Sequence, residues 1–202
     1  ASGTLPNGKA VIVNSDGTVS VVAGTAAGLG SAVVVNASFF STAAAFDSNS
    51  NKVVIAYRDD GNGRVGTAVV GTVSGTSISF GSEVVFGASG GSEARPHGMT
   101  FDSNSNKVVI SFTQGTTKAV VGTVSGTSIS FGTAVVFDSS RTDWTDITFD
   151  SNSNKVVICY KDKGNSSYGT AIVGTVSGTN ISFGTAAVFH STVANAQVIT
   201  FD

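Results

Sequence analysis

The feature that most constrains this chain is a decapeptide that occurs three times in its 202 residues. The sequence Phe-Asp-Ser-Asn-Ser-Asn-Lys-Val-Val-Ile begins at Phe46, Phe101 and Phe149, and a fourth Phe-Asp ends the chain. A second motif, Gly-Thr-Val-Ser-Gly-Thr, follows each decapeptide. The copies of this second motif begin at Gly71, Gly122 and Gly174. Self-similarity at a period of about 50 residues is the signature of a repeat architecture.

The composition of the chain favours strands over helices. Apolar residues make up 41% of the sequence, and they are mostly Val, Ala, Phe and Ile, with only two Leu and one Met. Thr, Ser and Gly are abundant, whereas the helix formers Glu, Gln and Lys are scarce. Short strands joined by tight turns are typical of this balance, so we predict an all-β fold.

The charge and apolar runs of the chain exclude some classes of partner. A net charge of −2 with 12% charged residues offers no basic face for nucleic acid. The longest apolar runs, such as residues 33–35, are too short to insert into a membrane, and residues 1–4 lack the features of a signal peptide. The single Cys159 allows no internal disulfide, and we interpret it as a packed thiol.

One repeat, residues 146–189, reads as four strands with turn-forming segments between them. Residues 150–154 are polar and Asn-rich, as is common in turns, and Ser177 and Gly178 mark a hairpin. The expected strands span residues 147–149, 155–161, 170–176 and 181–189, with the last interrupted at Gly184. Four antiparallel strands in about 50 residues match one blade of a β-propeller.

Alternation along the second strand of the repeat favours a propeller over a β-sandwich. Val53, Ile55 and Tyr57 share one face of that strand, and Val54 and Ala56 share the other. Both faces are apolar, so the sheet must be covered on both sides, as a blade is by its neighbours. A sandwich would give no reason for such faithful repetition of a four-strand unit.

The first repeat is degenerate and predicts how the ring closes. Residues 9–13, 18–22 and 31–35 match the second, third and fourth strands, but no first strand precedes them. Residues 197–201 form a spare first strand at the other end, and we expect it to pair with residues 9–13. The prediction is one four-bladed propeller domain over residues 1–202, closed within one chain or, by strand exchange, in a homo-oligomer. Its repeats span about 1–41 plus 197–202, 42–96, 97–145 and 146–196.

The two repeated motifs resemble repeats in the tail-fibre proteins of bacteriophages and in other large surface proteins of bacteria. The resemblance covers residues 42–202 and, more weakly, residues 9–35. It implies an adhesive or structural role at the cell exterior or on the virion surface. It supplies no catalytic residue to transfer to this chain.

Comparison of the repeats separates a uniform face from an individual one. The turn at residues 47–51 is identical at 102–106 and 150–154, and the hairpin at the Gly-Thr-Val-Ser-Gly-Thr motif is nearly so. The connections between second and third strands, and between successive repeats, differ in sequence. In a four-stranded meander these variable loops share one end, where binding residues are commonly found. Drift in tolerant loops is the alternative interpretation.

The variable loops contain the candidate ligand-binding residues. Trp144, the only tryptophan, could stack on the apolar face of a sugar while neighbouring polar groups bind hydroxyls, or it could simply fill the ring centre or wedge between blades. His97 and His190 lie in different repeats, without the spacing of a metal pair or a general base. The full candidate set is Trp144, Arg141, Asp143, Asp146, Glu93, Arg95, His97, His190, Asn195 and Gln197.

No cofactor or metal is expected. The Asp-x-Asn-x-Asn runs resemble the start of a calcium loop, but Lys52, Lys107 and Lys155 replace the glycine at the sixth position. We therefore interpret these runs as plain turns.

The leading functional hypothesis is a non-enzymatic recognition or adhesion module that binds a glycan or a cell-surface receptor. One alternative is a glycoside hydrolase, for which Asp143, Asp146 and Glu93 would have to supply the carboxylate pair. Another is a purely structural, self-assembling repeat.

Overall fold

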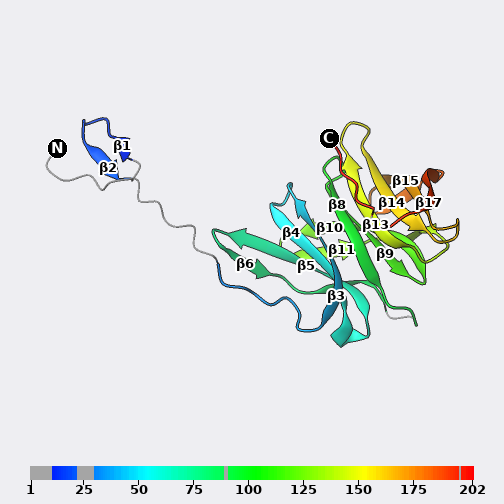
Figure 1. The fold of residues 1–202 in the computed structure, drawn as a ribbon. Helices are drawn as coiled ribbons and strands as arrows, with labels where there is room; N and C mark the ends of the chain where they lie inside the picture. Colours follow the sequence, from blue (N-terminus) through cyan, green and yellow to red (C-terminus); the bar gives the residue numbers. More distant parts are fainter. Residues whose placement is uncertain (1–10, 22–29, 89–90, 196) are drawn as a thin grey trace. The chain divides into compact units, whose positions relative to one another are not determined.

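The computed structural model describes residues 11–21, 30–88, 91–195 and 197–202, and it divides the chain into two compact units, Ala1–Ala32 and Val33–Asp202 (Figure 1). In the first unit, β1 (Val11–Val13) pairs antiparallel with β2 (Val19–Val21). The expected pairing of the second and third strands of the first repeat is confirmed over these residues, whereas Lys9, Ala10 and Val22 lie outside the described residues. The expectation of a strand at residues 31–35 is wrong, because the backbone there forms no ladder.

The second unit consists of three antiparallel sheets, one for each decapeptide, and its described residues contain no α-helix. The all-β prediction is therefore confirmed. The first sheet contains β3 (Phe39–Asp47), β4 (Lys52–Asp59), β5 (Val65–Ser74), β6 (Ser77–Phe80) and β7 (Val84–Gly87), with a 3₁₀ turn, η1 (Asp60–Asn62), after β4. The second contains β8 (Arg95–Asp102), β9 (Lys107–Gln114), β10 (Thr116–Ser125), β11 (Ser128–Phe131) and β12 (Val135–Asp138). The third contains β13 (Asp143–Asp150), β14 (Lys155–Asp162), β15 (Tyr168–Ser177), β16 (Asn180–Phe183) and β17 (Ala187–Val193).

Each sheet is a four-stranded meander whose last strand is broken at a glycine. In the third sheet, β16 and β17 both pair with β15, and the N–H of Gly184 between them donates to the carbonyl of Val173 at 2.9 Å. The predicted interruption at Gly184 is thus confirmed. The first strand of each sheet is longer than expected, because a β-bulge extends it toward the preceding loop, as between Asp143 and Asp146.

Each copy of the decapeptide forms the same turn in its own sheet. In the second sheet, Oδ1 of Asp102 accepts the backbone N–H groups of Asn104 and Ser105, and Oδ2 accepts the Ser105 hydroxyl. Asn106 then takes a φ of 53°, a left-handed conformation that Asn tolerates better than most residues. The turns at Asp47 and Asp150 have the same bonds. These carboxylates are engaged by the backbone.

The three sheets pack face to face, with their first strands side by side. β8 lies between β3 and β13 and contacts both (Figure 1). One apolar cluster fills the space between the first and second sheets, and another fills the space between the second and third. In β9, Val108 and Ile110 belong to the first cluster, and Val109 belongs to the second. The prediction that both faces of a sheet are covered holds fully for this middle sheet.

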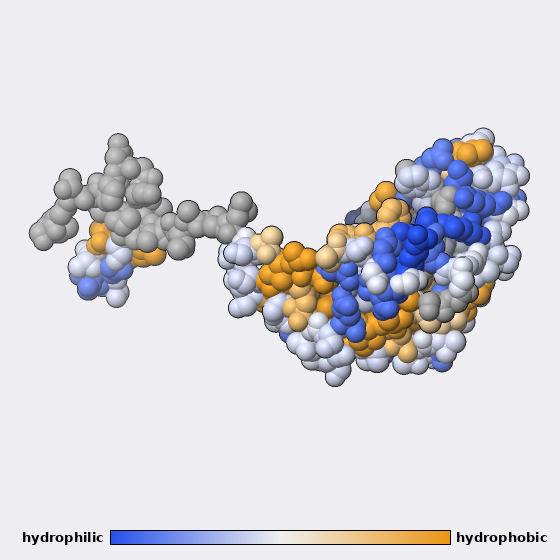
Figure 2. All heavy atoms as spheres, turned by 90° about the horizontal axis from the view of Figure 1, so that it is seen from below, coloured by the Kyte–Doolittle hydropathy of each residue, from blue (hydrophilic) through white to orange (hydrophobic). Residues whose placement is uncertain are grey.

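The two outer faces of the unit remain apolar and open. The valine directly before the Gly-Thr-Val-Ser-Gly-Thr motif is fully buried as Val70 and Val121 but 45% exposed as Val173 on the third sheet. On the first sheet, Phe46 is exposed although its counterpart Phe149 is buried. Hydrophobic patches are visible beside hydrophilic ones on the second unit in Figure 2.

The end of the chain forms no ladder within the second unit. The strand predicted at residues 197–201 was expected to pair with residues 9–13, which belong to the first unit and lie partly outside the described residues, so this pairing stays a prediction. The backbone of residues 197–202 lies beside β13, where the N–H of Ile199 donates to Oδ2 of Asp146 at 3.0 Å.

Candidate functional site

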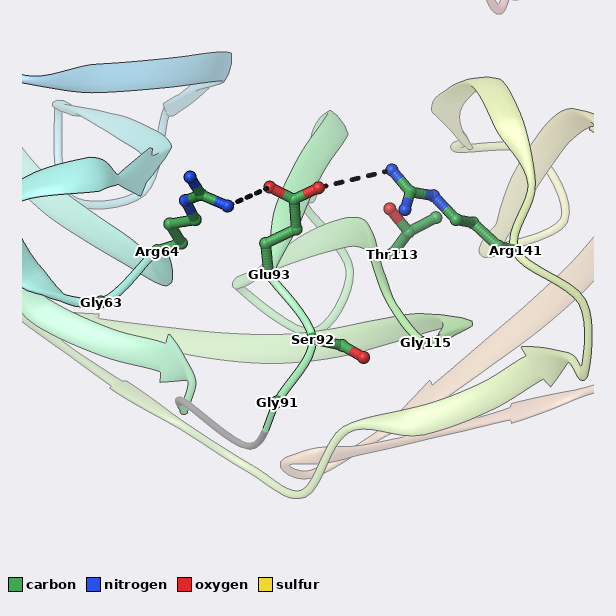
Figure 3. A pocket seen from close by; sticks show the side chains of 8 residues that line it. All are labelled: Gly63, Arg64, Gly91, Ser92, Glu93, Thr113, Gly115 and Arg141. Atoms are coloured by element: carbon green, nitrogen blue, oxygen red, sulfur yellow. Dashed lines mark ion pairs between the residues drawn. The ribbon is translucent and has the colours of Figure 1, made fainter.

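Variable connections from two neighbouring sheets surround one cavity. It has a volume of about 400 Å³ and lies among the loops after β4, β7, β9 and β12 (Figure 3). The prediction that these two kinds of loop share one end of the meander is confirmed here. The lining residues, which we call the arginine cavity, are Gly63, Arg64, Gly91, Ser92, Glu93, Thr113, Gly115 and Arg141.

Glu93 is the centre of an ion-pair network in this cavity. Nη1 of Arg58 donates to its Oε2 at 2.5 Å, and Nη2 of Arg95 donates to its Oε1. Arg58 also makes two bonds to Asp60, from Nε to Oδ1 at 2.6 Å and from Nη2 to Oδ2 at 3.0 Å. The hydrogen bond to Asp60 raises the pKa of Arg58, and the same bond lowers the pKa of the Asp60 carboxyl. Arg58 and Arg95, which we call the inner pair, therefore already bind protein carboxylates.

An aromatic ring also holds the inner pair. The guanidinium carbon of Arg58 lies 4.4 Å from the ring centroid of Phe40, and that of Arg95 lies 5.4 Å from it. Both distances fall within the range of a cation–π contact. The Arg58 side chain is only 8% exposed, so the inner pair is held in place beneath the cavity.

Two further arginines face Glu93 from opposite sides without bonding to it closely. Nη1 of Arg64 is 4.0 Å from Oε2, and Nη2 of Arg141 is 3.7 Å from Oε1. Both distances exceed that of a hydrogen bond. In Figure 3 the two guanidinium groups reach toward Glu93 from the first-sheet and second-sheet sides of the cavity. The side chains are 65% and 44% exposed, so their remaining donors are open to solvent.

Trp144 and Asp146 lie on β13, and neither lines the arginine cavity. Trp144 is exposed and has a φ of 53°, which is unusual for a bulky residue. Ser41, in the bulge of β3, has the same φ, so this conformation is shared by two of the first strands. Asp146 is engaged on both oxygens, by the N–H groups of Ile147 and Ile199. The backbone of Asp143 pairs with that of Lys161.

The remaining candidates lie elsewhere, which corrects the expectation of a shared set. His97 Nε2 is 3.1 Å from the Thr113 hydroxyl. His190, Asn195 and Gln197 line a separate, larger cavity of about 780 Å³ on the open face of the third sheet. Its other lining residues are mostly apolar and include Phe189, Val193 and Val198. Burial and the Asp146 charge raise the pKa of Cys159, which also borders this cavity, as expected of a packed thiol.

Sequence reasoning missed some of the residues that the structure brings together. Arg58, Asp60 and Arg64 were recognised only as part of a variable loop, although two of them bracket Glu93. Asp138 and Asp162 were also missed, and they border a smaller cavity of about 330 Å³. Burial raises the pKa of Asp138, and the neighbouring Asp162 carboxylate adds to the rise. The available signal was an excess of charge in loops of an otherwise weakly charged chain.

Comparisons with known proteins identify no family. No protein family matches the sequence, and no curated protein is detectably similar to it. Within the described part of the chain, no helix is long and apolar enough to cross a bilayer. The same residues contain no group of three or more His, Cys, Asp or Glu side chains arranged to hold a metal ion.

Proposed function

We propose that this chain is a non-enzymatic recognition module of a phage or bacterial surface or fibre protein, which binds a glycan at its variable loop face. The observation that carries this proposal is the arginine cavity, which is built from variable loops of two different sheets. Its setting would be extracellular or on the virion surface. The rigid sheets below position the loops, which is the usual division of labour in binding proteins.

We further propose that the module is a four-bladed propeller in which the three sheets are complete blades. The C-terminal segment supports this proposal by its register. Gly98 of β8 packs against Ile147 of β13, and a Cβ at Gly98 would meet the Ile147 side chain at 2.9 Å. Asp146 occupies the same repeat position as Gly98, and Ile199 occupies that of Ile147. Residues 197–202 therefore have the same position relative to β13 as β13 has relative to β8.

The degenerate first repeat would supply the rest of the fourth blade. Its hairpin exposes Ile12 and Val13, which need an apolar partner. The exposed Val173 and Phe189 on the third sheet, and Phe46 on the first, need the same. Covering all of them in one ring would remove the sheet edges that promote aggregation.

We expect removal of residues 197–202 to destabilise the protein and cause aggregation, beyond the effect of trimming a loose terminus. The first strand of the fourth blade would be lost, and the bond from Ile199 to Asp146 with it. Light scattering over a wide concentration range measures the outcome. A monomer of 20.2 kDa for the full chain supports closure within one chain. A fixed dimer or a growing polymer contradicts it and favours the self-assembling alternative.

The positions of the carboxylates favour binding over catalysis. A glycoside hydrolase needs one carboxyl group to donate a proton and another about 5–10 Å away. Glu93 faces guanidinium groups on both oxygens, and Asp146 accepts backbone N–H groups on both. Neither is free for that task. For the hydrolase alternative, Asp138 is the better candidate for the proton donor because its pKa is raised, and Asp162 lies beside it.

We expect the purified chain to bind a subset of glycans on an array, and Trp144→Ala to reduce that binding about tenfold or more by removing an exposed stacking surface. Val136→Ala is the control, because it removes an exposed apolar side chain of the middle sheet that does not line the arginine cavity. Absence of binding to every glycan on the array would contradict the proposed function. Hydrolysis of a chromogenic glycoside that Asp138→Asn abolishes would favour the enzyme instead.

A further inference from the structure

We propose that the arginine cavity binds an anionic group, the carboxylate or sulfate of an acidic carbohydrate. This inference rests on the proposed recognition function and deepens it by naming the class of ligand. The binding groups are Arg64 and Arg141, with Arg58, Arg95 and Glu93 as the floor beneath them.

The charges of the network do not balance. Four arginines, Arg58, Arg64, Arg95 and Arg141, surround Glu93, and Asp60 is the other carboxylate paired to the group. Two positive charges therefore remain uncompensated in this network, and two arginines face a single carboxylate among the residues that line the cavity itself, in a chain whose net charge is −2. Such a concentration of like charge is unfavourable unless an anion offsets it.

The hydrogen-bond donors show the same excess. A guanidinium group carries five N–H donors and no acceptor. Arg58 uses three of its donors on Asp60 and Glu93, whereas Arg64 and Arg141 make ion pairs to Glu93 of 4.0 and 3.7 Å. The unused donors suit an oxyanion, which accepts two parallel bonds from one guanidinium.

The shape of the cavity agrees with a small ligand rather than with an extended surface contact. Its volume of about 400 Å³ falls within the range of small-molecule sites, about 300–1,000 Å³. Gly91 and Gly115 line it with backbone, both at positive φ, so no side chain fills the space beside Ser92. The hydroxyl of Ser92 lies there and suits a sugar hydroxyl (Figure 3).

Neutralisation of Glu93 is the simpler explanation for the arginines, but it does not account for their number. Arg58 and Arg95 already bond both carboxylate oxygens. A third and a fourth arginine at longer range add repulsion among themselves and little further attraction, because exposed ion pairs contribute little to stability. Their arrangement is better explained by a ligand that bridges them.

The test is titration of the full chain with matched acidic and neutral probes, monitored by NMR and by calorimetry. The probes are acetate, sulfate, an oligosaccharide of glucuronic acid, a sulfated oligosaccharide and a neutral glucose oligosaccharide. The acidic oligosaccharides should bind at least about tenfold more tightly than the neutral one. That preference should weaken as NaCl rises from about 0.05 to 0.5 M, because salt screens exposed charges. The carboxylated and sulfated arms distinguish the two sources of the anion.

The key variant is the double substitution Arg64→Ala and Arg141→Ala, which removes exposed side chains and leaves the floor intact. We expect it to lose the preference for acidic probes. Lys107→Ala is the charge control on the uniform face and should change nothing. A second variant, Glu93→Gln, should bind the acidic probes more tightly, because it removes the competing carboxylate.

The outcomes separate this inference from the proposed function. Equal binding of acidic and neutral oligosaccharides, lost in Trp144→Ala but unchanged in the double arginine variant, would overturn the anion site and keep glycan recognition. Shifts at Arg64 and Arg141 with acetate or sulfate, without binding of any oligosaccharide, would keep the anion site and overturn glycan recognition. Absence of any response to all five probes would overturn both.

Discussion

Gly132→Ala is expected to lower the free energy of unfolding by about 3 kcal/mol, at the upper end of the usual cost of overpacking. Gly132 follows β11 and faces the hairpin turn of the third sheet. A Cβ there would lie 2.0 Å from the carbonyl oxygen of Thr179, which is backbone and cannot rotate away. The sheets would have to separate. Urea denaturation measures the change, and a loss below about 1 kcal/mol would contradict this packing.

The repeat supplies two matched positions for this experiment. Gly81 contacts the carbonyl oxygen of Thr127 in the same way, with a Cβ distance of 1.8 Å, so Gly81→Ala should cost as much. Gly184 is the third copy, and its nearest contact would be the Val173 carbonyl at an ordinary 3.8 Å. Gly184→Ala is therefore the matched comparison, and it should cost less than Gly132→Ala or Gly81→Ala because its Cβ makes only an ordinary contact.

The strands could be predicted from sequence because their causes are local. Apolar residues on both faces of a strand predict a sheet that is covered on both sides, as for Val108 and Val109 of β9, and the decapeptide turn uses only bonds between residues two or three positions apart. The break at Gly184 was visible as a glycine within an apolar strand. These features depend on neighbours in sequence, so each repeat determines them alone.

The arginine cavity could not be predicted because its causes are not local. Arg58 and Glu93 are separated by 35 positions, and Arg141 comes from the next repeat along the chain. Their meeting depends on the order and spacing of the sheets, which the repeat pattern suggests but does not measure. The same limit explains why His190 and Gln197 were grouped with Glu93, although they lie on the open face of the third sheet.

For the C-terminal segment, the prediction depends on a partner strand that is distant in the sequence. Its Phe-Asp ending copies the end of each first strand, so the sequence predicts a fourth one. Its predicted partner is residues 9–13, which belong to the first unit and lie partly outside the described residues. In the second unit, residues 197–202 contact β13 through the Asp146 carboxylate and form no ladder.

Phe112→Ala is expected to cost about 3–5 kcal/mol, the usual range for loss of a fully buried aromatic ring. Phe112 lies in the cluster between the first and second sheets, with its ring centroid 5.2 Å from that of Phe86 in an edge-to-face contact. Phe112→Leu is the matched control and should cost much less, because it keeps most of the buried volume. Thermal and urea unfolding measure both changes.

The same pair of variants tests whether the arginine cavity depends on this interface. Glu93 lies on the connection between the first two sheets, Arg58 is on the first, and Arg141 follows the second. A cavity that joins the two sheets should loosen when their shared core is emptied. We therefore expect Phe112→Ala, under conditions where it remains folded, to weaken binding of the acidic oligosaccharide, and Phe112→Leu to preserve it. Unchanged binding in a folded Phe112→Ala protein would show that the loops hold the arginines without support from the core.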